Sequence, residues 1–316
     1  MINVKVIEKF ALSDKVICIR LASTNNEPLP AASAGSHIDI HLPDNMIRQY
    51  SLCSDIGSDY YEIAVLKENN SRGGSIYIHN NLQVLDTVEI SEPKNLFSLE
   101  ASAQNSILFA AGIGITPILS MSEHLQQHNE TFTMHYCSQT ADNTAYRDRI
   151  LNSSLADKCH FHYSKEANSC RLNVADVMPN PDDNTHLYVC GPDGFINEVI
   201  KQAELKGWQS CNIHREFFAN SALDNTDNGT FEVEIKSSGD VFTIPEDETI
   251  LNVLEDNGIF IPVACEEGIC GTCVVGLLAG EADHRDTFMS EDEKAEMKTI
   301  TPCCSRAKSK RLVLDV

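Results

Sequence analysis

The feature that most constrains this chain is a group of cysteines near its C-terminal end. They have the spacing C-x4-C-x2-C, followed after a long gap by an adjacent pair: Cys265, Cys270, Cys273, Cys303 and Cys304. Four thiolates can hold a metal centre, and this spacing is typical of [2Fe–2S] ligation. Gly268 and Gly271 lie inside the loop, where glycine lets the backbone wrap closely and point amides at sulfur. The pattern therefore predicts a loop that binds an iron–sulfur cluster.

Three other interpretations of these cysteines remain open at this point. Zinc sites usually combine two C-x2-C pairs, and here only Cys270 and Cys273 have that spacing. A disulfide fits poorly with closely grouped thiols in a chain without a secretion signal. Inert buried cysteines are the simplest alternative. The spacing favours the cluster over all three.

Length and composition describe a chain of several domains. With 316 residues there is room for two or three, and a hydrophobic content of 42% is ordinary for a soluble protein. No apolar run approaches the ~20 residues of a membrane helix, and residues 1–6 resemble a strand rather than a signal core. We therefore expect a cytoplasmic protein whose 12 cysteines are reduced or metal-bound.

The charge of the chain bears on its partners. A net charge of −22 argues against binding to nucleic acid or to an anionic membrane surface. The charge would suit a basic docking face on a partner protein, although acidity can equally be only a solubility trait.

Residues 1–101 are predicted to form a small antiparallel β-barrel. Short β-branched or alternating runs, with turn residues between them and no long helical pattern, occur at 4–7, 16–21, 37–42 and 61–66. On this domain lies the motif Arg48-Gln49-Tyr50-Ser51-Leu52. Tyrosine can provide an aromatic wall beside a flat ring, arginine a fork for phosphate and serine a hydrogen bond near the ring. An ordinary barrel strand with an exposed arginine is the alternative.

A second motif of this domain is the glycine turn Ser71-Arg72-Gly73-Gly74-Ser75. Free amides in such a turn, at a helix N-terminus, can cradle a phosphate. Lys67, shortly before the turn, would add positive charge to the site. The alternative is a glycine turn without a ligand.

Residues 102–218 alternate between strands and helices, which predicts a parallel α/β domain. The buried run 106–110 leads into Ala111-Gly112-Ile113-Gly114-Ile115-Thr116-Pro117. A strand, a glycine turn and a helix in this order place free amides at a pyrophosphate or nicotinamide site. Gly112, Gly114 and Thr116 are the candidate residues, and a plain strand–helix turn is the alternative. The third glycine of the Rossmann fingerprint is missing, so the generic match is weak.

A second turn of this domain, Cys190-Gly191-Pro192, follows the strand at 186–189. Ligands of open parallel sheets collect at this edge, so the turn is a second candidate binding site. It resembles the C-G-P turn of ferredoxin reductase-like proteins, which implies a place beside the nicotinamide. We expect Cys190 to pack and position rather than to react covalently. No basic residue occupies the Ser138-Gln139-Thr140 segment, which favours NADH over NADPH modestly.

The remaining chain is predicted to be a linker at 219–229 and a cluster-binding domain at 230–316. Two alternating strands precede a helix near 250–257, for which Asp247 is the expected cap, and the cysteine loop follows. This order resembles a plant-type ferredoxin of the α+β (β-grasp) class.

Several motifs together resemble those of the phthalate dioxygenase reductase family. The motif at 48–52 resembles the flavin-binding strand of ferredoxin reductase-like proteins, which implies that residues 1–101 bind a flavin. The segment G-x-G-I-T-P resembles that of their NAD domains, and residues 214–218 resemble the motif H-F-E-x-F that ends this domain in the family. Phe218 is the candidate to cover the flavin, with Phe217 as the alternative. The segment 303–307 resembles the family's C-V-S-R-A, which implies that Cys303 is the fourth ligand and that Cys304 replaces an apolar residue.

The resemblance implies a mechanism. Matching segments in this family bind FMN rather than FAD, so we expect hydride transfer from NADH to FMN and single-electron transfer through [2Fe–2S] to a Rieske-type oxygenase. Ser51, Thr116 and Cys190 are the catalytic candidates, and Tyr50 helps to align the two rings. Runs at 68–75, 135–138 and 303–314 resemble the carnitine monooxygenase reductase subgroup.

Other functions remain open at this point. The partner could be a vanillate or phthalate oxygenase, a ferredoxin-like carrier or a cytochrome. The chain could also be a non-catalytic, zinc-binding module.

Overall fold

The computed structural model describes the chain except for residues 26, 55–56, 69–72, 167–170 and 219–227. It forms two compact units, Met1–Glu216 and Phe217–Val316. The expected boundary at residue 101 falls inside the first unit, and most of the expected linker lies outside the described residues. Among the described residues, no helix combines the length and the hydrophobicity needed to span a bilayer.

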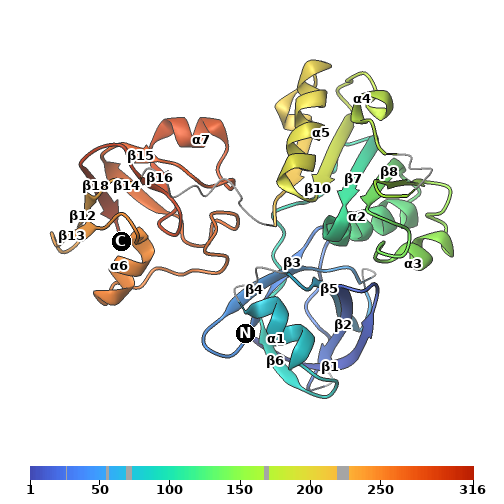
Figure 1. Cartoon of the computed structure of the whole chain (residues 1–316), viewed down its shortest axis with the longest axis horizontal. Helices are drawn as coiled ribbons and strands as arrows, with labels where there is room; N and C mark the ends of the chain where they lie inside the picture. Colours follow the sequence, from blue (N-terminus) through green and yellow to red (C-terminus); the bar gives the residue numbers. More distant parts are fainter. Residues whose placement is uncertain (26, 55–56, 69–72, 167–170, 219–227) are drawn as a thin grey trace. The chain divides into compact units, whose positions relative to one another are not determined.

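The first sheet of the first unit is antiparallel and has six strands in the order β4-β3-β6-β1-β2-β5 (Figure 1). Its elements are β1 (Ile2–Ala11), β2 (Val16–Ser23), β3 (His37–His41), β4 (Ile47–Ser51), β5 (Tyr60–Leu66), α1 (Gly74–Asn80) and β6 (Thr87–Ile90). A bridge between Leu52 and Ile63 joins the two outermost strands. Ile19, Ile38 and Ile63 fill the interior and are fully buried. The predicted antiparallel barrel is confirmed.

The second sheet of this unit has five parallel strands in the order β11-β10-β7-β8-β9. Its strands are β7 (Asn105–Ala111), β8 (Thr131–Ser138), β9 (Cys159–Tyr163), β10 (Thr185–Cys190) and β11 (Ile213–Glu216). Its helical elements are η1 (Gly112–Gly114), α2 (Ile115–Gln127), α3 (Arg147–Leu151), α4 (Val174–Val177), α5 (Asp193–Leu205) and η2 (Ser210–Asn212). Ile118 of α2 packs with Leu108 and Tyr188 in one buried cluster. The predicted parallel α/β fold is also confirmed.

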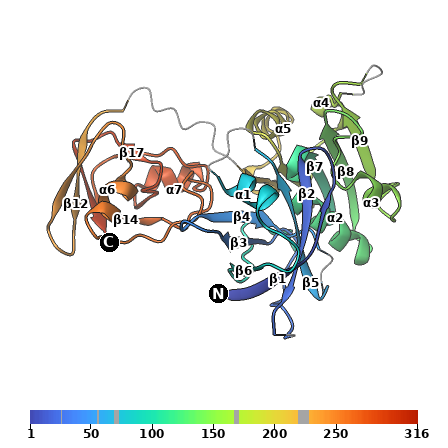
Figure 2. The ribbon, with the colours of Figure 1, turned by 60° about the horizontal axis from the view of Figure 1, so that its bottom comes forward.

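The second unit contains a mixed five-stranded sheet, β13-β12-β18-β14-β16, and a small β15-β17 pair (Figure 2). Its elements are β12 (Phe231–Ile235), β13 (Val241–Ile244), α6 (Ile250–Asp256), β14 (Val275–Ala279), β15 (Ala282–Asp283), α7 (Glu291–Glu296), β16 (Thr299–Ile300), β17 (Arg306–Ala307) and β18 (Arg311–Asp315). The central pair β12 and β18 is parallel, whereas the other pairs are antiparallel. This is the expected ferredoxin-like arrangement.

The start of α6 differs from the expectation. Thr249, not Asp247, caps the helix, because its hydroxyl accepts a hydrogen bond of 3.0 Å from the amide of Asn252. Asp247 lies three residues before the first helical residue, which is too far for a side chain to reach the first free amides.

Arg306 ties together the segments on which the second unit depends. Its guanidinium donates to the carbonyls of Glu248 at 2.7 Å, Pro245 at 2.8 Å and Gly229 at 3.1 Å. It also lies 5.0 Å from the centre of the Phe231 ring. Only 6% of Arg306 is exposed, so these contacts are sheltered from water.

We expect Arg306→Met to lower the free energy of unfolding by about 2–3 kcal/mol, because three carbonyls lose a charged donor. Urea unfolding followed by far-ultraviolet circular dichroism measures the change. Arg311→Met is the matched control, because Arg311 pairs with Glu232 and Glu234 through a side chain that is 45% exposed. Equal effects of the two substitutions would contradict the role given to Arg306.

Candidate functional site

The cysteine loop of the second unit lies between α6 and β14, and backbone amides point at its sulfur atoms. The Sγ atom of Cys265 accepts from the amides of Glu267 and Ile269, each at 3.4 Å, and that of Cys270 accepts from Thr272 at 3.5 Å. Amide donors of this kind stabilise negative charge on sulfur. The hydrogen bond with Cys265, followed by those from Thr272, lowers the pKa of Cys270.

The four predicted ligands meet as two pairs. Cys265 is hydrogen-bonded to Cys270, and the Sγ atoms of Cys273 and Cys303 are 3.3 Å apart. Within the described part of the chain, no three His, Cys, Asp or Glu side chains are grouped so that they could hold one metal ion. Two thiol pairs fit a two-iron cluster, in which each iron takes two thiolates, better than a single tetrahedral zinc ion.

The loop has room for its backbone only because glycine occupies two positions. Gly268 has φ +71°, and a Cβ atom there would lie 2.4 Å from the Sγ atom of Cys304. Gly271 has φ +69°, and a Cβ atom there would lie 2.3 Å from the ring of Phe288. The same contact places the sulfur of Cys304 beside Gly268, 3.4 Å from the Thr301 hydroxyl. Cys304 is also hydrogen-bonded to Cys303, whose sulfur in turn faces Cys273.

The carboxyl ends of the parallel strands form the second candidate site, in the first unit. The turn after β7 touches the turn after β10, since a Cβ atom on Gly114 would lie 2.4 Å from the carbonyl of Cys190 and 2.6 Å from the nitrogen of Gly191. Thr116 is buried in the first turn of α2 and donates to the carbonyl of Ile113 at 3.0 Å. Pro192 precedes α5 as its N-cap. The structure thus brings the two predicted nicotinamide motifs together.

A glutamate whose Oε2 atom is buried lies at the same edge, and the sequence analysis did not single it out. Glu216 ends β11 and pairs in register with Cys190. Burial raises its pKa to about 8, while a hydrogen bond with Ser51 acts in the opposite direction. Within the part of the chain that the structure describes, its Oε2 atom has no hydrogen-bond partner. The signal that could have revealed it is its place in the segment 214–218, which resembles the motif H-F-E-x-F.

The groups around Glu216 suit a polar ligand. Ser51 is 6% exposed, and Cys190 is fully buried. Burial, followed by the nearby charge of Glu216, raises the pKa of Cys190 well above its usual value, so the group remains a thiol, as expected for packing rather than reaction. A buried polar atom without a partner is rare in a native fold. Such an atom beside Ser51 fits a site whose last hydrogen bond is made by a ligand.

The two flavin motifs of the barrel also meet. A Cβ atom on Gly74 would lie 2.6 Å from the Cγ atom and 2.8 Å from the Nε atom of Arg48, so the arginine crosses the glycine turn. Gly73 has φ +93° and precedes α1. The hydroxyl of Ser75 accepts from the amide of Glu68 at 3.3 Å. Residues 71–72 of this motif lie outside the described residues.

Other predicted residues lie away from this turn. The Gln49 amide donates to Asp39 at 2.9 Å, and Lys67 donates at 3.2 Å to Asn80, at the opposite end of α1. Tyr50 is partly buried, and burial raises its pKa. Phe218 belongs to the second unit and is 37% exposed.

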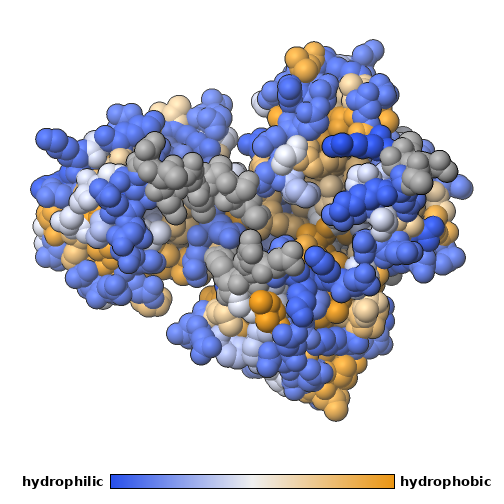
Figure 3. Space-filling view, viewed as in Figure 1, coloured by the Kyte–Doolittle hydropathy of each residue, from blue (hydrophilic) through white to orange (hydrophobic). Residues whose placement is uncertain are grey.

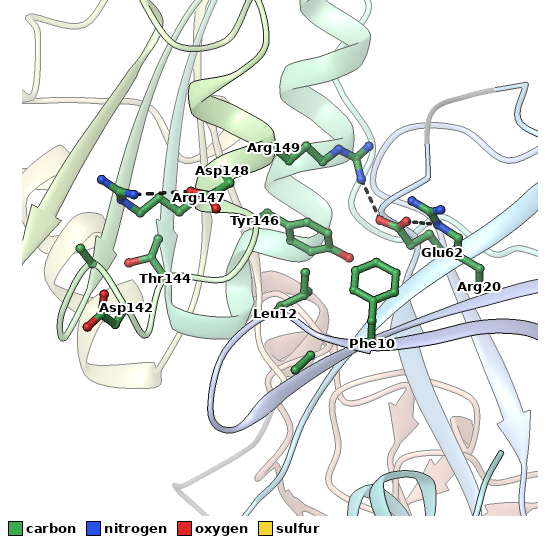
Figure 4. A pocket seen from close by; sticks show the side chains of 12 residues that line it. Phe10, Leu12, Arg20, Glu62, Asp142, Thr144, Tyr146, Arg147, Asp148 and Arg149 are labelled. Atoms are coloured by element: carbon green, nitrogen blue, oxygen red, sulfur yellow. Dashed lines mark hydrogen bonds and ion pairs between the residues drawn. The ribbon is translucent and has the colours of Figure 1, made fainter. Parts of the chain in front are cut away.

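A cavity of about 600 Å³ opens elsewhere in the first unit, beside the β1–β2 turn and α3 (Figure 4). None of the residues predicted for a site lines it. The face of the molecule seen in Figure 3 is largely hydrophilic, in keeping with the net charge of −22.

Comparisons with known proteins agree with this geometry. Residues 233–308 match the 2Fe-2S iron-sulfur cluster binding domain, and residues 91–213 match the N-terminal domain of dimethylamine monooxygenase subunit DmmA-like proteins. The vanillate O-demethylase oxidoreductase of Pseudomonas sp. (strain HR199 / DSM 7063) is 44% identical over 317 residues, which cover 100% of both chains. The carnitine monooxygenase reductase subunit of Escherichia coli (strain K12) is 38% identical and covers 100% of this chain and 98% of its own.

The solved structure of phthalate dioxygenase reductase is 34% identical, has a TM-score of 0.78 and covers 99% of this chain and 97% of its own. That protein is described as a modular structure for electron transfer from pyridine nucleotides to [2Fe–2S]. The chain belongs to the phthalate dioxygenase reductase family. Members of this family are NADH-dependent oxidoreductases with a flavin and a [2Fe–2S] cluster. The predicted family, fold, enzyme class and cofactors FMN, NADH and [2Fe–2S] are confirmed for this reductase.

We expect Glu216→Gln to flatten the pH dependence of stability of this reductase. The pKa of Glu216 is raised from 4.5 to about 8. The contribution of this carboxyl to the free energy of unfolding is therefore fully present below pH 4.5 and is lost as pH rises through 8. Between pH 4.5 and 8, the free energy of unfolding of the wild type should therefore fall by on the order of a few kcal/mol more than that of Glu216→Gln. Urea unfolding of both proteins at each pH measures this difference. If the unfolding free energies of the two proteins change with pH in the same way, the pKa of Glu216 is not raised.

Proposed function

We propose that this protein is the reductase component of a two-component system with a Rieske-type oxygenase. The observation that carries the proposal is the presence of two sites in one chain: a buried polar site at converging strand ends, and a loop with two thiol pairs. The first site suits the nicotinamide and flavin rings, between which hydride is transferred. The second suits an iron–sulfur cluster that passes single electrons to a partner. We further propose three modules, 1–101, 102–218 and 230–316, joined by a linker at 219–229.

In the first unit, the residues of this chain would bind and orient the two reacting rings. When bound, FMN supplies the conversion of a two-electron hydride into single electrons. Arg48, where it crosses Gly74, would hold the phosphate. Ser51 and the carboxyl of Glu216 offer polar groups beside the ring, and Tyr50 would form its wall.

The turns at the ends of β7 and β10 would hold the nicotinamide. Gly112 and Gly114 leave the backbone free of side chains where the two turns touch, and Thr116 fixes the first turn of α2. Cys190, with Gly191 and Pro192, completes the opposite wall as a protonated thiol. Close contact of this kind excludes water from a site of hydride transfer.

In the second unit, Cys265 and Cys270 would hold one iron, and Cys273 and Cys303 the other. The amides of Glu267, Ile269 and Thr272 would stabilise the thiolates. The distance of 3.3 Å between the Sγ atoms of Cys273 and Cys303 supports Cys303 as the ligand.

We propose a Rieske-type oxygenase as the partner. The sequence runs at 68–75, 135–138 and 303–314 favour a carnitine monooxygenase-like oxygenase, and a vanillate or phthalate oxygenase is the alternative. Purified reductase, NADH and each type of oxygenase component, assayed for product, distinguish these partners from a ferredoxin-like carrier or a cytochrome.

A cysteine variant tests the order of electron transfer. We expect Cys273→Ser to keep NADH-driven reduction of an artificial acceptor that takes electrons from flavin, but to abolish cytochrome c reduction, because the exit centre loses a ligand. Spectrophotometric assays measure both reactions. Equal survival of both activities would contradict the proposed order.

Cys304→Ser is the matched control, because Cys304 is the adjacent cysteine that is not assigned as a ligand. It should retain cytochrome c reduction, together with iron and acid-labile sulfide. Loss of iron in Cys304→Ser with retention in Cys303→Ser would reverse the assignment. A wild type without iron, sulfide or flavin would end the proposal and favour a zinc-binding module.

A further inference from the structure

A buried carboxylate joins the β-barrel to the α/β part of the first unit. The side chain of Glu62, on β5, is 1% exposed and accepts from two arginines (Figure 4). Its Oε2 atom is 2.7 Å from the Nε atom of Arg20, on β2, and its Oε1 atom is 2.7 Å from the Nη1 atom of Arg149, on α3. Both carboxylate oxygens are thus engaged, one within the barrel and one across to the α/β part.

Arg149 continues the network to α2. Its Nε and Nη2 atoms donate to the two carboxylate oxygens of Glu123 at 2.8 and 2.7 Å. This paired geometry fixes the plane of the guanidinium as well as its distance. The barrel strand β5 and the helix α2 are therefore connected through a single arginine.

Glu62 and Glu123, the two glutamates that Arg149 connects, lie on elements that also carry residues of the proposed hydride-transfer site. The backbone carbonyl of Glu62 accepts from the amide of Cys53 at 2.8 Å, two residues after Ser51. Glu123 lies on the helix whose first turn carries Thr116. A shift of α2 against β5 would therefore move Thr116 relative to Ser51.

A shared hydrophobic core also joins the two parts, because buried residues of the barrel and of α2 belong to one cluster. The cavity of about 600 Å³ borders Glu62, Arg20 and Arg149, so packing is looser at the edge where these ion pairs lie. Tyr146 makes a further contact there: its hydroxyl lies 3.9 Å from the sulfur of Cys18 in the barrel. Tyr146 has φ +60°, a conformation that costs energy in residues other than glycine and persists only where the surroundings enforce it.

We propose that Glu62 is a positioning residue for hydride transfer, acting through Arg149 and Glu123 to fix α2 against the flavin strand. This inference rests on the proposed function. Reacting groups must lie within a narrow range of distance and direction, and a displacement of about 1 Å can cost on the order of 100-fold in rate. An ion pair sheltered from water is strong enough to matter here, because breaking one partner leaves the other charge buried.

The test uses Glu62→Gln in the full-length protein with its cofactors. The neutral amide keeps the size of the side chain but cannot pair with two guanidinium groups. We expect single-turnover bleaching of the flavin by saturating NADH to slow at least tenfold, while flavin and iron contents stay at wild-type levels. Transfer from photochemically reduced flavin to cytochrome c should not change, because it does not need the nicotinamide. We also expect calorimetry to show the barrel and the α/β part melting less cooperatively.

Glu8→Gln is the matched control. Glu8 contacts the same Arg20 at 2.8 Å, but its side chain is 51% exposed, and among the described residues it forms no ion pair with the α/β part. The rate at which NADH bleaches the flavin of Glu8→Gln should stay within twofold of the wild-type rate. Glu123→Gln gives a second test from the other side of Arg149, should Glu62→Gln fail to fold, and should also slow bleaching.

Wild-type bleaching in either Glu62→Gln or a folded Glu123→Gln would overturn the inference and leave the proposed function intact. An equal loss in Glu8→Gln would also overturn it, by assigning the effect to Arg20 alone. A wild type that NADH does not bleach would overturn the proposed function, and the inference with it.

Discussion

The hydrogen bonds from backbone amides to cysteine sulfur are the interactions on which the second unit depends. They require the loop to turn its amides inward, and Gly268 and Gly271 permit this with positive φ angles. Neighbouring side chains then fill the space that the glycines leave: Cys304 lies against the first and Phe288 against the second. The loop is thus shaped as much by the absence of two Cβ atoms as by the cysteines themselves.

This loop was predictable because its information is local. Cysteine spacing and glycine positions can be read within a few residues, and the paired thiols agree with them. The glycine turns of the first unit were predictable for the same reason, since Gly114 meets Cys190 at an edge that any parallel sheet provides. The expected cap at Asp247 was wrong because several polar residues compete near a helix start, and only geometry selects Thr249.

Long-range pairs could not be predicted in this way. Arg149 meets Glu62 from 87 residues away, and neither residue belongs to a motif. Gln49 stands in the flavin motif, yet its amide binds Asp39 on the neighbouring strand, because adjacent positions of a strand face opposite sides. Glu216 was missed because an acidic residue at a strand end usually faces solvent, and only the folded structure shows that its Oε2 atom is buried.

Two glutamates of the first unit show how structural and functional charges differ. Glu62 has an arginine on each oxygen, so its burial is compensated within the protein. Glu216 has Ser51 beside it, but its buried Oε2 atom has no hydrogen-bond partner among the described residues, in keeping with the raised pKa. Because buried polar atoms in native folds usually have partners, this atom suits a hydrogen bond to a bound ligand, at the edge where a parallel sheet binds its ligands.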